Sequence, residues 1–131
     1  HVVGISRSSP TEELIERHPK LSWLVYDSSQ SEADSDVVRT LNNLLAGKKL
    51  LGAYLCAGIY SSGEPADLSH QDYKISIEGN LYTTINMVRL VLELVSPGGS
   101  IIVLNSQAAI SSSNTEIAYG LAKRAISSYV E

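Results

Sequence analysis

A tyrosine and a lysine four residues apart have the residue types and spacing that proton-transfer chemistry needs. Tyr119 and Lys123 lie in AYGLAKRAI, a segment rich in helix-forming residues. On a helix, side chains at this spacing share one face and lie one turn apart. A lysine ammonium favours the ionised form of a nearby phenol, which lowers the pKa of the phenol toward the working range of a general acid or base. Such pairs also arise by chance in a chain with seven tyrosines, so their surroundings must support the interpretation.

A serine upstream adds a third polar group to this pair. Ser106 ends the apolar run SIIVLNS and precedes Tyr119 by 13 residues. One loop of that length can bring both hydroxyls into a common cleft beyond the carboxyl end of a strand. A serine hydroxyl there can hold a carbonyl oxygen while a proton moves. We therefore predict a general acid/base site formed by Ser106, Tyr119 and Lys123.

The elements that must position these residues alternate along the chain. Short apolar runs predict strands over 2–6, 21–27, 50–58 and 100–106. Helical periodicity predicts helices over 9–18, 31–47, 72–95 and 117–131. Capping sequences support three of the helix starts: Ser9 to Glu12 with Pro10, Ser31 with Asp34, and residues 69–72. Gly47 is a predicted helix end. Each connection between strands is long enough to hold a helix, which favours parallel strands. We therefore expect one α/β domain over 1–131, with a doubly wound, mostly parallel sheet and helices on both faces.

Composition excludes several classes of function. The chain has 131 residues, 44% hydrophobic and 18% charged, which is typical of one soluble globular domain. No run approaches the roughly 18 apolar residues of a membrane span, so we expect a cytoplasmic protein with no membrane partner. A net charge of -4 without a basic stripe argues against nucleic acid. The single cysteine, Cys56, is expected to be a small buried residue, and the scattered histidines predict no metal site.

On these residues the sequence resembles the short-chain dehydrogenase/reductase family over its whole length. Ser106 and the Tyr119-to-Lys123 spacing match that family's Ser and Tyr-x-x-x-Lys, and CAG at 56–58 is similar to its Asn-Ala-Gly. The resemblance implies a Rossmann-like fold and hydride transfer between a nicotinamide and a small-molecule carbonyl or alcohol. Tyr119 would exchange the proton, Lys123 would assist it and hold the ribose, and Ser106 would position the substrate oxygen.

The same resemblance implies a set of cofactor-binding residues. Besides Tyr119 and Lys123, these are Ser6, Arg7, Asp27, Ser28, Cys56, Ala57 and Gly58. Asp27 would lie near the adenine. Arg7 follows the first strand, where a guanidinium reads the 2′-phosphate, so NADP is favoured over NAD. The other interpretation of Arg7 is a solvated surface charge.

Three features depart from the family pattern. SIEG at 76–79 is similar to the family's Asn-x-x-Gly, so Ser76 stands at the place of an asparagine of the proton relay, and Asn80, one turn on, is a second candidate. The glycine-rich phosphate turn and its strand have no counterpart here. That strand lies between those at 2–6 and 50–58 in the family, so we expect a split sheet with open edges. The last helix also lacks the family's following segment.

These departures leave two hypotheses for the chain as it stands. In the first hypothesis, the chain is the middle of a longer reductase. The family then implies a homodimer or homotetramer that forms through the helices at 72–95 and 117–131. The alternative is a catalytically inactive Rossmann-like module for binding or assembly.

Overall fold

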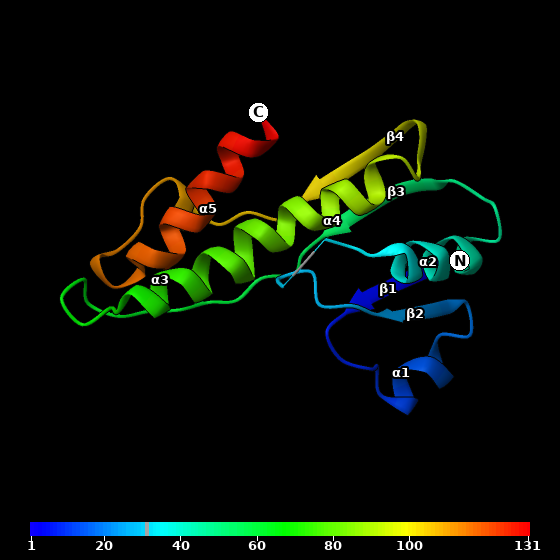
Figure 1. Cartoon of the computed structure of the whole chain (residues 1–131), viewed down its shortest axis with the longest axis horizontal. Helices are drawn as coiled ribbons and strands as arrows, with labels where there is room; N and C mark the ends of the chain where they lie inside the picture. The colour runs from blue at the N-terminus through cyan, green and yellow to red at the C-terminus, as the bar shows by residue number, and fades with distance from the viewer. Residues whose placement is uncertain (31) are drawn as a thin grey trace.

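Figure 1 shows the computed structural model of the chain, which describes residues 1–30 and 32–131. The strands are β1 (Val2–Ser6), β2 (Leu21–Val25), β3 (Leu50–Leu55) and β4 (Val95–Val103). The helices are α1 (Glu12–Arg17), α2 (Ser35–Leu45), α3 (His70–Ile77), α4 (Thr83–Leu92) and α5 (Ile117–Val130). The predicted alternation of strands and helices is confirmed, and most differences concern where elements begin and end.

The strands form two separate parallel pairs. β1 pairs with β2, with Val2 opposite Leu21, and β3 pairs with β4, with Leu55 opposite Val103. Among the described residues β1 and β3 do not pair, and a cavity of about 1310 Å³ is lined by both strands. The expected division of the sheet into two parts with open edges is therefore confirmed.

One apolar core joins the two strand pairs. Its buried residues come from β2 and the residue after it, α2, β3 and α4: Leu24, Tyr26, Leu41, Leu45, Leu55, Met87, Leu90 and Val91. Each fully buried side chain of this kind contributes roughly 1.5–3 kcal/mol. Since β1 and β3 share no ladder, α2 and α4 connect the pairs through this core.

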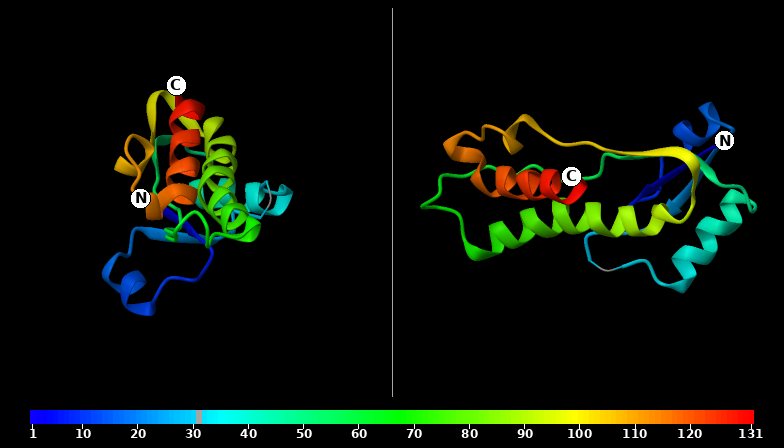
Figure 2. Two further views of the ribbon diagram at one scale, coloured as in Figure 1. Left: turned by 90° about the vertical axis from the view of Figure 1, so that its left-hand side faces the viewer. Right: turned by 90° about the horizontal axis from the view of Figure 1, so that it is seen from above.

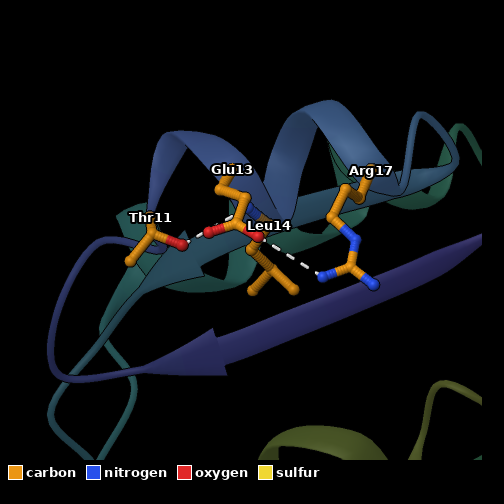
Figure 3. A network of polar contacts seen from close by, with 4 residues as sticks. All are labelled: Thr11, Glu13, Leu14 and Arg17. Carbon is orange, nitrogen blue, oxygen red and sulfur yellow. Dashed lines mark hydrogen bonds and ion pairs between the residues drawn. The ribbon is translucent and has the colours of Figure 1, made fainter.

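The N-cap of helix α1 lies two residues later than the predicted cap, Ser9. Figure 3 shows that the Thr11 hydroxyl accepts a hydrogen bond from the Leu14 amide, at 3.3 Å, which makes Thr11 the N-cap. The Glu13–Arg17 ion pair, at 3.4 Å, lies along the exposed face of the same helix. Ser9 is therefore not the cap, because threonine can supply the same hydroxyl directly before the helix.

Helix α2 has a capping aspartate and a left-handed end. Asp34 accepts from the amides of Asp36 and Val37, both at 2.9 Å, while the other predicted capping residue, Ser31, lies outside the described residues. Ala46 then adopts a φ of 50° and Gly47 a φ of 74°. The chain therefore leaves the helix at the predicted place.

The single helix predicted over 72–95 is divided into three parts. α3 begins at a complete capping box of Ser69 with Asp72, as predicted, and a π-helical turn at Glu78–Tyr82 then separates it from α4. Figure 2 shows that the combined helix lies beside α5. The π turn contains one more residue per turn than an α-helix, so the two parts present different faces.

The fourth strand starts earlier and ends earlier than the predicted 100–106. β4 already pairs at Val95, and its register shifts between Leu50 and Gly52 on the partner strand. Gly98 adopts a φ of 82°, which only glycine takes up without strain. Ser106 consequently lies beyond the strand, in the loop that follows it.

Candidate active site

Tyr119 and Lys123 lie together on α5, as their spacing predicts. The Lys123 Nζ lies 5.6 Å from the centroid of the Tyr119 ring, within the range of a cation–π contact. It also donates a hydrogen bond to the Leu104 carbonyl at 3.3 Å. Lys123 is only 5% exposed, whereas Tyr119 is half-buried. The ammonium is thus buried beneath the ring, whereas part of the ring is open to solvent.

The Lys123 ammonium is poorly compensated for a buried charge. In the part of the chain that the structure describes, no carboxylate lies within ion-pair distance of it. Burial therefore lowers the pKa of Lys123 from its usual value. A buried lysine whose pKa is lowered in this way marks a candidate functional site.

Ser106 is fixed in the loop between β4 and α5. Its hydroxyl oxygen accepts from the Ala108 amide at 3.2 Å and begins a 3₁₀ turn at Gln107–Ala109. Its amide donates to the Asn105 side chain at 2.9 Å, and Asn105 donates in turn to Ser127 of α5 at 2.8 Å. These bonds tie the serine segment to the helix that carries Tyr119.

A glycine allows α5 to approach the serine loop closely. A Cβ built on Gly120 would lie 2.9 Å from the Ala108 carbonyl and 2.7 Å from the Ser112 Cβ. Any larger residue would have to push the loop away. Gly120 therefore helps to hold Tyr119 and Ser106 on facing segments.

Asn80 connects the π turn to the loop that follows β3. Its side-chain amide donates to the carbonyls of Ile59 and Ser76, both at 2.9 Å, and its oxygen accepts from the Ile59 amide at 3.3 Å. A Cβ on Gly58 would lie 2.7 Å from this oxygen and 3.5 Å from the Lys123 Nζ. Gly58, Asn80 and Lys123 therefore meet at one point, which requires the absence of a side chain at Gly58.

Ser76, predicted as a catalytic residue, makes none of these side-chain contacts. It is fully buried, and among the described residues its hydroxyl has no hydrogen-bond partner. The structure brings Asn80 rather than Ser76 to the Ile59 backbone. Helical spacing alone does not separate the two, because the π turn that points Asn80 inward leaves no clear sequence pattern.

All predicted cofactor-binding residues except Tyr119 and Lys123 line one cavity. Ser6, Arg7, Asp27, Ser28, Cys56, Ala57 and Gly58 all line the space of about 1310 Å³ between β1 and β3. The prediction of a buried Cys56 is wrong, because the strand ends at Leu55 and Cys56 is exposed in the loop.

Asp27 and Arg7 differ in how firmly they are held. Hydrogen bonds from Ser29 lower the pKa of Asp27, and the charge of Arg7 lowers it further. The Ser29 hydroxyl donates to the Asp27 carboxylate at 2.6 Å. Arg7 is exposed and takes part in none of the ion pairs of the described chain. Its guanidinium is therefore available to an anion.

Two residues beside Tyr119 were not predicted. The ring of Tyr60 packs against the Tyr119 ring with 5.2 Å between centroids and 71° between planes. The Tyr60 hydroxyl donates to Glu116 at 3.3 Å. No motif marks these residues, since their proximity depends on how two loops meet.

Neither a metal-binding cluster nor a membrane-spanning helix occurs in residues 1–30 and 32–131. No group of three or more His, Cys, Asp or Glu side chains is arranged to hold a metal ion there. No helix of that part has the length and apolarity to cross a membrane.

A model of a known protein family, described as enoyl-(acyl carrier protein) reductase, matches residues 2–131. The chain belongs to the short-chain dehydrogenase/reductase family. Comparison with curated proteins found no match.

Solved structures of short-chain dehydrogenase/reductases share the fold. A family protein from Burkholderia multivorans with bound NADP superposes with a TM-score of 0.80 at 21% identity, over 98% of this chain and 58% of that one. A carbonyl reductase from Pseudomonas aeruginosa PAO1 in complex with NADP gives 0.79 at 23%, over 98% and 58%. A 3-oxoacyl-[acyl-carrier protein] reductase from Brucella melitensis gives 0.85 at 14%, over 98% and 56%. The expected Rossmann-like α/β fold is confirmed, and the chain spans less than two thirds of these relatives.

Proposed function

We propose that this short-chain dehydrogenase/reductase is an NADP(H)-dependent oxidoreductase that interconverts a carbonyl and an alcohol. The observation that carries the proposal is the buried Lys123 ammonium under the ring of Tyr119, which has no carboxylate partner among the described residues. Burial of a charge that its contacts compensate only in part costs free energy, and a chemical role for that charge accounts for its presence.

The chain's own residues supply the proton chemistry. Tyr119 gives its hydroxyl proton to the oxygen of the carbonyl substrate, and the resulting phenolate is stabilised by the Lys123 ammonium. Ser106, whose hydroxyl oxygen is fixed by the Ala108 amide, would keep its proton and donate a hydrogen bond to the same substrate oxygen. When bound, the nicotinamide supplies the hydride that adds to the carbonyl carbon. Asn80 holds the Ile59 backbone and keeps the loop beside Lys123 in place.

One end of the cavity would hold a phosphorylated dinucleotide. Arg7, Asp27 and Ser28 line it directly after the carboxyl ends of β1 and β2, where ligands of open α/β sheets bind. The free Arg7 guanidinium would hold a 2′-phosphate, and Asp27 would lie near the adenine. Two solved relatives are described with NADP, which agrees with this choice over NAD.

The partners follow from the same site. We expect a small-molecule carbonyl or alcohol as substrate, and a homodimer or homotetramer as the assembly. Exposed apolar side chains on α4 and α5, Leu92 at 60% and Leu121 at 55%, support self-association. The open edges of β1 and β3 favour the second hypothesis, a binding or assembly module without turnover.

Replacement of Tyr119 by phenylalanine tests the proposal. We expect Tyr119→Phe to abolish NADPH oxidation with a reactive dicarbonyl and to leave NADPH binding, measured by fluorescence, unchanged. Tyr129→Phe on the same helix is the matched control and should retain turnover. Unchanged turnover in Tyr119→Phe would reject the proton-donor role. A wild-type protein that binds NADPH but reduces no carbonyl would favour the inactive module.

A further inference from the structure

Tyr60 is a largely exposed aromatic side chain that is nevertheless fixed. It is 63% exposed, yet its ring packs on Tyr119 and its hydroxyl is bonded to Glu116. An exposed tyrosine on a loop normally samples several rotamers, because nothing restrains it. Contacts at both the ring and the hydroxyl hold this one beside the proposed proton donor.

The residue that holds Tyr60 is itself fixed. Glu116 accepts from the Ser113 hydroxyl at 2.9 Å and from the Ser113 amide at 3.3 Å. These bonds lower the pKa of Glu116, and the Tyr60 hydroxyl adds to the effect. The Gly63 amide also donates to the Thr115 carbonyl at 2.8 Å. The loop after β3 and the turn before α5 are thus joined at two places beside Tyr119.

The two tyrosine rings form a corner. Their planes meet at 71°, so a flat molecule stacked on Tyr60 stands nearly perpendicular to the Tyr119 ring. In an aryl aldehyde or ketone the carbonyl group lies in the plane of the aromatic ring. Such a molecule can stack its ring on Tyr60 and extend its carbonyl along that plane toward Tyr119.

We propose that Tyr60 is a specificity-determining residue that selects carbonyl substrates carrying an aromatic ring. The inference rests on the proposed carbonyl–alcohol chemistry and adds the substrate class. Aromatic stacking contributes roughly 0.5–1.5 kcal/mol beyond area burial, and a saturated ring of similar size obtains only the burial. Part of Tyr60 is open to solvent and available for this contact, while the bond to Glu116 holds its hydroxyl in place.

Two aldehydes that differ only in the ring give the test. We expect the purified protein to favour benzaldehyde over cyclohexanecarbaldehyde in kcat/KM by roughly three- to tenfold. Tyr60→Phe keeps the ring and should keep the preference, whereas Tyr60→Leu should remove it. Tyr129→Leu, a change of an exposed tyrosine elsewhere on the chain, should leave the ratio unchanged. A ratio that Tyr60→Leu does not alter would overturn the inference.

A binding measurement separates this inference from the proposed function. With tyrosines labelled at the ring carbon, benzyl alcohol should shift the Tyr60 signal, assigned by its loss in Tyr60→Phe, and cyclohexylmethanol should not. This result supports the aromatic subsite even if neither aldehyde is reduced, in which case the proposed function fails by itself. Equal shifts with both alcohols, or no shift with either, would refute the subsite.

Discussion

At the scale of single residues, Lys123 combines a chemical role with a cost in stability. Its ammonium is 5% exposed and has a carbonyl and an aromatic face as its contacts, which compensate a buried charge only in part. Methionine has a similar length and carries no charge, so it can fill the same space.

We expect Lys123→Met to raise the free energy of unfolding by about 1–2 kcal/mol and to abolish carbonyl reduction. Urea unfolding followed by circular dichroism and an NADPH oxidation assay measure the two effects. A less stable variant would contradict the expected cost of the buried charge, and retained carbonyl reduction would contradict its chemical role.

Asn80 and Ser76 should respond in opposite ways to truncation. Asn80→Ala leaves both backbone groups of Ile59 without their partner and should cost about 2–4 kcal/mol. Ser76→Ala removes a buried hydroxyl that has no partner in the described structure and should be neutral or stabilising. Denaturant midpoints of the two variants check this, and equal losses would refute the distinction between the residues.

The placement of the candidate residues was more predictable than that of their supports. Tyr119 and Lys123 lie on one helix face as their spacing predicts, whereas Ser106 was predicted to end a strand and lies in the loop beyond β4. Asn80 was left open, since a π turn changes which residue faces inward without a change in composition. Tyr60 and Glu116 could not be found, because their contact joins two loops that no periodicity describes.

At the scale of elements, the start of α3 makes the fold sensitive to acid. Hydrogen bonds from the hydroxyl and the amide of Ser69 lower the pKa of Asp72 below its unfolded value. A carboxylate with a lowered pKa stabilises the fold above its unfolded pKa, and this contribution is lost as pH falls through the folded pKa.

We therefore expect Asp72→Asn to lose stability at neutral pH and to match the wild type only in acid, below the lowered folded pKa of Asp72. Urea unfolding at both pH values measures this. Ser69→Ala also removes the hydroxyl oxygen that accepts from the Asp72 amide, so part of its loss of stability should persist in acid. A constant difference between wild type and variants at all pH values would contradict the assignment.

Element boundaries show where sequence signals compete. The Ser69–Asp72 cap was predicted correctly, because one pair of residues offers the full box. At α1 both Ser9 and Thr11 can act as caps, and the choice depends on the path of the chain after β1. β4 was predicted to start after the glycines at 98–99, yet pairing with β3 extends it back to Val95.

At the scale of the whole molecule, two strand pairs depend on one shared core. A two-stranded sheet is marginal by itself, and here the facing edges of β1 and β3 border a large cavity. We expect the 131-residue chain to bind the apolar dye ANS and to unfold at low urea concentration. A sharp transition at high urea without dye binding would contradict this expectation.

The π turn of Glu78–Tyr82 has a consequence for how this protein tolerates change. Each residue of a helix advances the direction of its side chain by about 100°, so one residue more or fewer rotates everything that follows. Asn80 reaches the loop beside Lys123, while Met87, Leu90 and Val91 reach the strands, only because of this phase. If one residue were removed from the turn, either Asn80 or the three core residues could keep their direction, and the others would point away from their present contacts. The number of residues between the site and the core is therefore constrained more strictly than the identity of most of these residues. Single substitutions would not reveal this constraint, whereas deletion of one residue would.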